Sequence, residues 1–416
     1  MRLLPPRRAR SVTLEHSLPL ELVEGADTSS PSELVEGSGE ETSTEAPIAP
    51  PKTRALPEAT AMLFMRPGQP HEPVAVPQVM LAPGEVLVET EFATVCGSDV
   101  HTVLGHRSEA TPLVLGHEAV GRVTALGTDA PLALDGTPVQ IGDRVVWSVA
   151  VHCGACDRCR RGLPQKCRTL RKYGHERIGQ GWELTGGFAT HVHLRAGTAI
   201  LRVPEELPAK VLAPASCGIA TAWAALAAAE RTVRFDGATV LITGGGLIGL
   251  AAAAMASERG AHVVVSDPEP GRRALAAQFG ADAVIDPVMG EPAAADPRYG
   301  AVDVVIEASG APRALVTGIE SAGVGAAVVL VGSVFPSDPV ALSPERVVRR
   351  QLSISGVHNY APADLVGAVD FLARAWQRFS FESLVGECFA LGELDAALVR
   401  AARRREVRVG VDPRTS

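Results

Sequence analysis

Apolar and polar positions follow two different patterns along the chain. In its first half they alternate over 61–65 and 85–95, which is typical of strands that bury one face, and further strands are expected at 119–125 and 143–149. Four prolines between 67 and 77 and several later glycines divide this region into turns and edge strands. The pattern predicts a compact β-rich domain.

From residue 238 the apolar residues instead form short uninterrupted runs with helical stretches between them. Such runs are typical of strands buried on both faces of a sheet, and they cover 238–243, 262–266, 302–307, 326–331 and 352–354. Ala-rich helical sequence precedes them up to residue 230, and a further helix is expected at 362–378. The alternation predicts a doubly wound parallel sheet with helices on both faces, so the fold class is α/β with an additional β-rich domain.

The C-terminal segment is too short to form a domain of its own. Strand-like pieces around Cys388 and over 407–411 follow the last helix. We expect this segment to pack against the β-rich domain and Cys388 to be a buried structural thiol.

The N-terminal region has a composition that does not support a packed core. Residues 11–50 contain nine acidic side chains and no Lys or Arg, and the pentapeptide ELVEG occurs at 21–25 and again at 33–37. Low hydrophobicity with high charge predicts a disordered tail over 1–58. Two copies are too few for a repeat fold, so we interpret them as a local duplication.

Composition and charge exclude several classes of function. The net charge of −8 and an aromatic content of 4% argue against a nucleic-acid-binding protein. No apolar run reaches the roughly 18–20 residues of a membrane span, and the basic first ten residues are not followed by the apolar core of a secretory signal. Seven cysteines, mostly clustered, indicate metal ligation in a reducing compartment, so we expect a cytoplasmic protein.

Four of the cysteines form a candidate metal site. They follow the spacing C-x2-C-x2-C-x7-C and comprise Cys153, Cys156, Cys159 and Cys167. Four thiolates at this density are typical of a closed structural zinc site. An iron–sulfur cluster is the alternative, but the bacterial ferredoxin pattern has a shorter last gap followed by Pro, whereas Arg168 follows here. We interpret the basic residues around these cysteines, from Arg158 to Lys172, as a solvated face rather than an anion site.

A second candidate metal site lies near the end of the first long predicted strand. Its residues are Cys96, Ser98, Asp99 and His101, followed by His117 and Glu118. A thiolate and an imidazole are zinc ligands, and the two carboxylates are of the kind that orient or tune a metal-bound ring. The serine hydroxyl and the second imidazole offer a route for a proton away from the metal.

The strand at 238–243 leads into the glycine pattern of a dinucleotide-binding turn. Gly244, Gly246, Leu247, Ile248 and Gly249 are followed by an Ala-rich helix and a second strand that ends at Asp267. The glycines allow a tight turn, and the helix N-terminus stabilises a pyrophosphate. We expect Asp267 to accept hydrogen bonds from the adenosine ribose and to repel a 2′-phosphate, which favours NAD over NADP. Arg272 is expected on the adenosine side.

Together these residues resemble the zinc-dependent medium-chain dehydrogenase/reductase family, in its alcohol dehydrogenase branch. The motifs CGSDVH, GHEAVG, the four-cysteine lobe, ASCG and GGGLIG occur in the family's order, and the resemblance covers about residues 61–416. It implies four segments: a tail outside the family, a GroES-like catalytic domain, a Rossmann NAD-binding domain, and a return to the catalytic domain. Their ranges are 1–58, 59–215 with the structural zinc lobe at 153–167, 216–355 and 356–416.

The resemblance also implies roles for individual residues. Cys96, His117 and Cys217 are similar to the catalytic zinc ligands of the family, although Cys217 alone reads as an ordinary core thiol. Ala213 stands where polyol and threonine dehydrogenases of the family often carry Glu, so the chain is closer to the Cys-His-Cys alcohol dehydrogenases. One catalytic and one structural zinc ion per chain, NAD as cofactor and a homodimer or homotetramer are expected. Ser98 and His101 are similar to the family's proton relay, in which His101 is expected to face solvent.

The substrate is the least determined feature. The runs HTVLGHRSEATPLVLGHE, KCRTLRKYGHE and PASCGIATAW resemble a branch associated with phosphonate metabolism. Arg107 lies in a loop expected to border the zinc pocket, so one hypothesis is a small alcohol or aldehyde that carries a phosphonate. The alternatives are a polyol, amino alcohol or aminocyclitol dehydrogenase of the same family and, in another class, a non-catalytic nucleotide-binding protein.

Overall fold

The computed structural model describes residues 52–288 and 301–415. Most of the predicted N-terminal tail therefore lies outside the described residues. Its last part does not, because Thr53–Ala55 form strand β1, which pairs antiparallel with β4 (Val79–Leu81). The predicted end of the tail at residue 58 is therefore wrong, because strand β1 already begins at Thr53. Composition shows whether a segment can form a core, but not whether its backbone can add to an existing strand.

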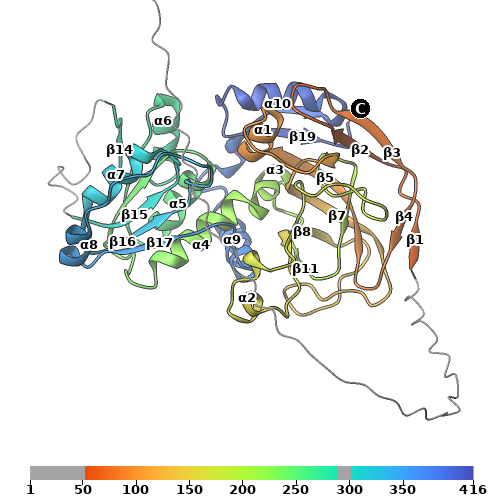
Figure 1. Ribbon diagram of the computed structural model, residues 1–416, viewed down its shortest axis with the longest axis horizontal. Coiled ribbons are helices and arrows are strands. Elements are labelled where there is room, and N and C mark those ends of the chain that lie inside the picture. Colours follow the sequence, from red (N-terminus) through yellow and green to blue (C-terminus); the bar gives the residue numbers. More distant parts are fainter. Residues whose placement is uncertain (1–51, 289–300, 416) are drawn as a thin grey trace, which may run out of the picture. The chain divides into compact units, whose positions relative to one another are not determined.

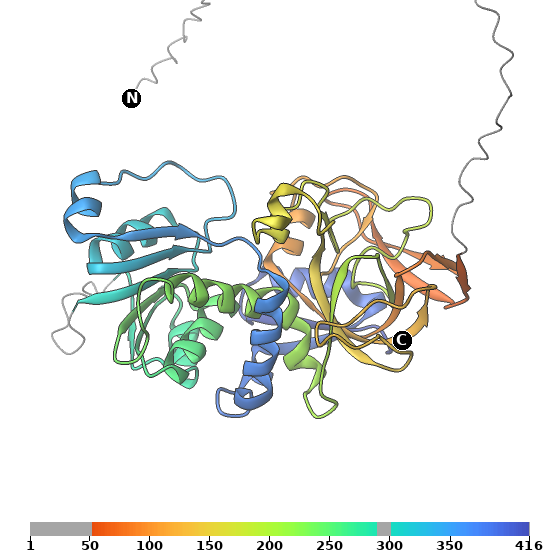
Figure 2. The same cartoon turned by 90° about the horizontal axis from the view of Figure 1, so that it is seen from below.

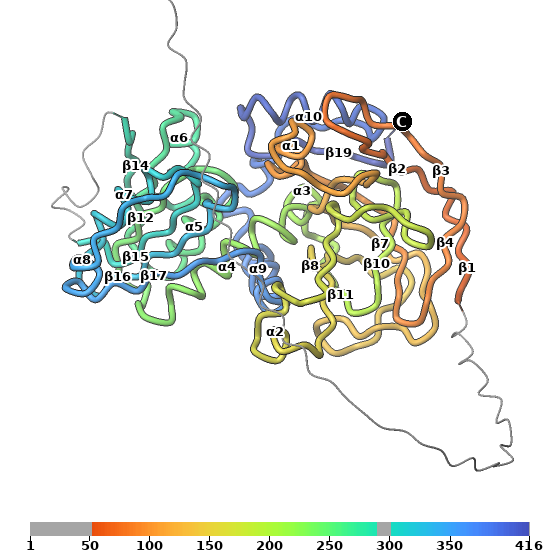
Figure 3. Tube along the Cα trace, viewed as in Figure 1, coloured from red at the N-terminus to blue at the C-terminus, as the bar shows by residue number. Residues whose placement is uncertain are grey.

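An eight-stranded sheet forms the main body of the β-rich part (Figure 1). Its order is β11-β8-β7-β5-β19-β18, with β10 also paired to β5 and β9 to β8. The strands are β5 (Val86–Val95), β7 (Glu118–Leu126), β8 (Arg144–Val151), β9 (Arg171–Lys172), β10 (His191–Leu194), β11 (Thr198–Arg202), β18 (Val385–Ala390) and β19 (Arg408–Asp412). Strand β19 pairs antiparallel with β5, so distant parts of the chain meet in the middle of this sheet, where the blue C-terminal segment lies among orange ones (Figure 3).

A smaller three-stranded sheet in the order β3-β2-β6 accounts for the proline-rich region. It consists of β2 (Ala59–Phe64), β3 (Glu72–Val76) and β6 (Leu113–Val114). Strand β3 contains Pro73 and lies at an edge, where a residue without an N–H costs no ladder hydrogen bond.

A six-stranded parallel sheet forms the second half, in the order β14-β13-β12-β15-β16-β17. Its strands are β12 (Thr239–Thr243), β13 (His262–Ser266), β14 (Ala283–Ile285), β15 (Val302–Glu307), β16 (Ala322–Leu330) and β17 (Ser353–Gly356). Successive side chains of β12 enter different cores: Val240 and Ile242 pack with α4 and α5, whereas Leu241 packs with α7 and α8. Helices therefore cover both faces of the sheet (Figure 2), and the predicted α/β fold class is confirmed.

The helices connect and flank these sheets. Their bounds are α1 (Gly97–Val103), α2 (Asp157–Arg160), α3 (Ala209–Leu212), α4 (Gly218–Ala229), α5 (Leu247–Glu258), α6 (Pro270–Gln278), α7 (Pro312–Ser321), α8 (Pro344–Arg350), α9 (Pro362–Ala375) and α10 (Leu394–Ala402). Among the described residues, no single helix is both long and apolar enough to cross a membrane, and only the bent pair Ala209–Ser216 and Gly218–Ala229 meets that test jointly.

The predicted burial of Cys388 is wrong. The residue is exposed, because it belongs to β18, the edge strand of the eight-stranded sheet, whose central residues face solvent. An alternating sequence pattern identifies a strand, but it does not show whether that strand is central or at an edge.

Candidate active site

The N-terminus of helix α1 positions the first cysteine of the candidate site. Cys96 precedes α1, and its backbone N–H donates to one oxygen of Asp99 over 2.9 Å. The other oxygen accepts from the N–H of Gly116 and lies 3.4 Å from Nδ1 of His117. Asp99 is completely buried. A single carboxylate therefore fixes the backbone of the cysteine and orients the imidazole.

Cys217 completes a cluster of three soft donor atoms. It directly precedes α4, and its Sγ lies 4.0 Å from Sγ of Cys96. The donor atoms of these two residues, His117 and Glu118 all lie within 4.8 Å of one another. The hydrogen bond between the thiols lowers the pKa of Cys96 well below its usual value and raises that of Cys217. Two sulfurs and an imidazole nitrogen are suitable ligands for a catalytic zinc, so the cluster fits that metal.

Glu118 is engaged by an arginine that the sequence analysis missed. Arg408 on β19 donates to both oxygens of this carboxylate, over 2.7 and 2.8 Å, and the Thr94 hydroxyl donates over 2.6 Å. Burial raises the pKa of Glu118, and the positive charge of Arg408 opposes that rise. The two residues are 290 positions apart, and no local motif marks Arg408.

The two predicted relay residues occupy successive turns of α1. Ser98 Oγ lies 3.4 Å from Nε2 of His117. The ring of His101 lies 4.3 Å from that of Phe335, which follows β16 of the parallel sheet. His101 is half-buried rather than open to solvent as predicted, and burial, followed by nearby cations, lowers its pKa.

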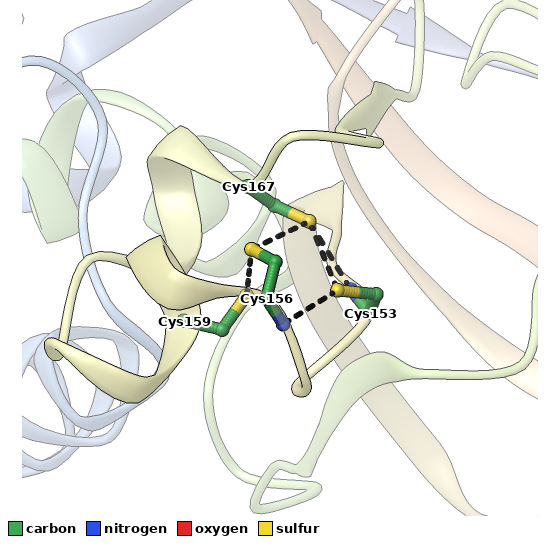
Figure 4. Close-up of side chains that lie close together, drawn as sticks. All are labelled: Cys153, Cys156, Cys159 and Cys167. Carbon is green, nitrogen blue, oxygen red and sulfur yellow. Dashed lines mark hydrogen bonds between the residues drawn. The ribbon is translucent and has the colours of Figure 1, made fainter.

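The four remaining predicted ligands form a separate cluster, shown in Figure 4. The Sγ atoms of Cys156 and Cys159 are 3.5 Å apart, those of Cys156 and Cys167 are 3.9 Å apart, and those of Cys167 and Cys153 are 3.5 Å apart. Backbone N–H groups of Cys153 and Cys156 also donate to these sulfurs. Four convergent thiols with amide support fit a closed tetrahedral zinc site.

The glycine loop between β12 and α5 has the geometry that a dinucleotide requires. Gly244 has a φ of +100°, and a Cβ at Gly249 would lie 1.8 Å from the carbonyl oxygen of Gly244, so neither position accepts a larger residue. Leu247, Ile248 and Gly249 form the first turn of α5 after Gly246. Asp267 Oδ2 accepts the N–H of Gly245 over 2.6 Å, which places the carboxylate beside the loop.

One pocket of about 180 Å³ joins the nucleotide loop to the metal cluster. Its lining includes Cys96 and Arg408 from one side and Gly246, Leu247 and Arg272 from the other. Arg272, expected on the adenosine side, donates from Nη2 to the carbonyl oxygens of Arg404 and Glu406. The guanidinium therefore connects the parallel sheet to the segment before β19.

Arg107 is not among the residues that line the pocket at the metal cluster, and it is linked to the cluster through Glu109 and His175. Its Nε lies 2.6 Å from Glu109, and the same carboxylate oxygen lies 3.3 Å from Nδ1 of His175. The ring of His175 lies 4.9 Å from that of His117. Burial, more than any charge, lowers the pKa of His175 to about 4, so this ring is neutral near pH 7.

Two family profiles match the chain, an alcohol dehydrogenase GroES-like domain over residues 82–205 and a zinc-binding dehydrogenase domain over 248–374. The 5-exo-hydroxycamphor dehydrogenase of Pseudomonas putida is 30% identical over 329 residues, which cover 76% of this chain and 88% of that protein. The D-arabitol-phosphate dehydrogenase of Enterococcus avium is 27% identical, with 79% and 90% covered.

A solved structure agrees with this assignment. The alcohol dehydrogenase of Thermotoga maritima superposes with a TM-score of 0.80 and 31% sequence identity, over 85% of this chain and 99% of that one. Since both family profiles, a relative at 30% identity and the superposition coincide with the two metal clusters and the glycine loop, the chain belongs to the zinc-dependent medium-chain dehydrogenase/reductase family and is an oxidoreductase.

Proposed function

We propose that this protein transfers hydride between NAD and a small alcohol or aldehyde. The observation that carries the proposal is the shared pocket, in which Cys96 of the metal cluster and Gly246 of the nucleotide loop line the same space. Hydride transfer requires the reacting carbon and the nicotinamide to be held in contact. A metal site and a dinucleotide site that open into one pocket supply that arrangement.

Three residues, Cys96, His117 and Cys217, would hold the catalytic zinc. When bound there, zinc supplies Lewis acidity for a carbonyl and lowers the pKa of an alcohol. Asp99 keeps the imidazole of His117 in place through Nδ1, and Arg408 balances the negative charge that gathers around Cys96 and Glu118. Because Glu118 is completely buried and only 11% of the Arg408 side chain is exposed, this balance is set by the fold more than by solvent.

Proton movement is assigned to two residues of α1. The Ser98 hydroxyl beside Nε2 of His117 takes the proton of an alcohol or returns it to an alkoxide. His101, one turn further along the helix, passes that proton toward solvent. The ring of Phe335 packs on that of His101, with the ring centres 4.3 Å apart.

For the substrate we propose a small alcohol or aldehyde that carries an anionic group, such as a phosphonate. The resemblance to the phosphonate-associated branch supports this class, as does the position of Arg107 behind His175. The Enterococcus avium relative is named for a phosphorylated substrate, so the family includes enzymes for such molecules.

A turnover panel tests these proposals. The zinc-loaded protein is assayed with neutral and phosphonate-bearing aldehydes of matched size, phosphonoacetaldehyde among them, and with the corresponding alcohols. We expect turnover with NAD(H) and none in Cys96→Ser. A protein that holds two zinc ions and binds NADH but turns over no member of the panel would be a non-catalytic nucleotide-binding protein.

A polyol, amino alcohol or aminocyclitol is the second candidate class. The same relative supports it, since D-arabitol phosphate is also a polyol derivative. Ala213 opposes it, because the family's polyol and threonine dehydrogenases often carry Glu at that position. Adding polyols and amino alcohols to the panel separates the two classes.

We also propose a cytoplasmic homodimer or homotetramer. All seven cysteines are free thiols, as expected in a reducing compartment. Among the described strands, β17 is the last of the parallel sheet on one side, and this edge can pair with a second copy. Analytical ultracentrifugation of the zinc-loaded protein measures the assembly directly, and a monomer would contradict it.

A further inference from the structure

One lysine of the four-cysteine lobe differs from the other basic residues there. Seven basic side chains surround the lobe and were expected to form a solvated face: Arg158, Arg160, Arg161, Lys166, Arg168, Arg171 and Lys172. Six of them are exposed, but Lys172 is half-buried. Within the described ranges no carboxylate pairs with its ammonium group. A partly desolvated, unpaired cation is costly to maintain, so its surroundings call for an explanation.

Lys172 is linked to the metal cluster through His175. Its strand β9 pairs with β8, where Lys172 is opposite Ala150. Its carbonyl oxygen accepts the N–H of His175, whose ring lies 4.9 Å from that of the proposed zinc ligand His117. Burial, followed by the positive charges of Arg107 and Lys166, lowers the pKa of Lys172, and the carboxylate of Glu109 opposes that shift.

A second chain segment brings another lysine and a histidine to the same place. The Tyr360 hydroxyl donates to the carbonyl oxygen of Ser216 and accepts the N–H of Val149, which holds the segment after β17 against β8 and the Cys217 turn. Two residues earlier, His358 accepts a short hydrogen bond from Lys166 at Nδ1.

His358 is neutral and retains a donor. Burial and the positive charges of Lys172, Lys166 and Arg107 lower its pKa to about 4. With Nδ1 accepting from Lys166, the ring proton is on Nε2 and is available to a ligand oxygen. Its neighbour Asn359 also has a buried Nδ2 for which the described part of the chain offers no acceptor.

The local charges do not cancel. The positive charges of Arg107 and Lys166 act on Lys172, and Glu109, a carboxylate that opposes them, is already shared by Arg107 and His175. Two ammonium groups are therefore left without an anion among the described residues. Such an excess is suited to a doubly charged ligand group more than to a carboxylate.

We propose that Lys172, Lys166 and His358, with Arg107 behind them, form the subsite that binds a phosphonate or phosphate group of the substrate. This inference rests on the proposed function, and it adds residues from the four-cysteine lobe and the segment after β17 that the Arg107 hypothesis did not contain. The reacting carbon would then lie at the metal cluster while the dianion is held at the lobe. Because the dianion is equally charged before and during hydride transfer, loss of the subsite should raise KM and leave kcat largely unchanged.

The test compares Lys172→Gln with a matched control, Arg160→Gln, which removes one positive charge from an exposed position of the same lobe. Binding of methylphosphonate to the zinc-loaded protein with NAD is measured by calorimetry, and acetate serves as the monoanion. We expect one methylphosphonate site per chain, weakened about ten- to a hundredfold in Lys172→Gln and unchanged in Arg160→Gln. Lys172→Arg should restore most of the affinity, and KM for phosphonoacetaldehyde should follow the same order.

The outcomes separate this inference from the proposed function. If Lys172→Gln and Arg160→Gln weaken methylphosphonate binding equally, the cluster acts only through long-range electrostatic attraction, and the proposed subsite is wrong. Turnover of neutral aldehydes without methylphosphonate binding would also overturn it while the oxidoreductase assignment stands. Binding that depends on Lys172 in a protein that reduces no aldehyde would support the subsite and remove the proposed reaction.

Discussion

Replacing Asp267 by Asn tests how the protein chooses its cofactor. Both oxygens of this carboxylate are fixed: Oδ2 accepts the N–H of Gly245 over 2.6 Å and Oδ1 that of Glu269 over 2.8 Å. Two arginines, Arg272 and Arg273, follow in the sequence, and each has partners other than this carboxylate. Arg272 donates to carbonyl oxygens before β19, and Arg273 donates to the carbonyl oxygen of Asp267 and pairs with an acid after β14. A 2′-phosphate placed beside Asp267 would therefore meet a negative charge, which Nη1 of Arg272, a buried donor with no partner among the described residues, offsets only in part.

The size of this effect follows from the charges. Two unit charges 4 Å apart interact by about 4 kcal/mol at an effective dielectric constant of about 20, and salt reduces that value. A penalty of about 2–4 kcal/mol corresponds to about a 30- to 1000-fold preference. We expect kcat/KM for NAD to exceed that for NADP by this factor in the wild type.

The assay measures kcat/KM with both cofactors in wild type, Asp267→Asn and Asp303→Asn. Asp303 is a matched control, because its carboxylate also accepts a backbone N–H, that of Thr239 over 2.9 Å, at the opposite end of the parallel strands. Asp267→Asn should remove most of the preference and Asp303→Asn none of it. A wild type that uses both cofactors equally, or a preference that survives in Asp267→Asn, would show that this carboxylate does not face the ribose.

Three further predictions follow from the metal clusters and the sheets. The pure protein should contain two zinc ions per chain, and iron or a single zinc on elemental analysis would contradict this. Cys153→Ser should lower the melting temperature, whereas Cys96→Ser should abolish turnover with little change in melting temperature. Arg408→Met should lower the free energy of unfolding by about 3–5 kcal/mol, since it leaves the carboxylate of Glu118 buried without its partner. This loss of stability should be smaller when Glu118→Gln is added, and additive losses in denaturant titrations would refute the coupling. A chain that starts at residue 52 should match the full chain in zinc content and turnover. One that starts at residue 62 lacks β1 and half of β2 and should melt at a lower temperature. Equal melting temperatures of the two chains would show that these strand residues contribute nothing to stability.

Features encoded in one short stretch were predictable, because spacing alone decides which atoms meet. The four-cysteine lobe and the glycine loop with Asp267 are of this kind, and the structure brings each set together. Cys217 was assigned only through the family resemblance, since an isolated thiol carries no local signal. Its meeting with Cys96 depends on how α4 packs beneath the β-rich sheet.

The residues that the sequence analysis missed are those delivered by long-range strand pairing. Arg408 reaches Glu118 because β19 pairs with β5, and the apolar and polar pattern of the sequence does not show which strands will be neighbours. The same reason explains why the lobe was interpreted as a uniform basic face. Lys172 is half-buried because the segment around His358 is held against β8 by Tyr360, far away in the sequence.

The position of β19 has a consequence for the order in which the protein matures on the ribosome. This strand lies between β5 and β18 and contributes Arg408 to the metal pocket, yet it is translated after every other strand of both sheets. All strands of the parallel sheet, from β12 to β17, are translated earlier, so a nascent chain can form its nucleotide-binding half before the pocket at the metal cluster is complete. A premature stop codon just before β19 would therefore yield a protein with an intact dinucleotide loop and an unfinished reaction centre.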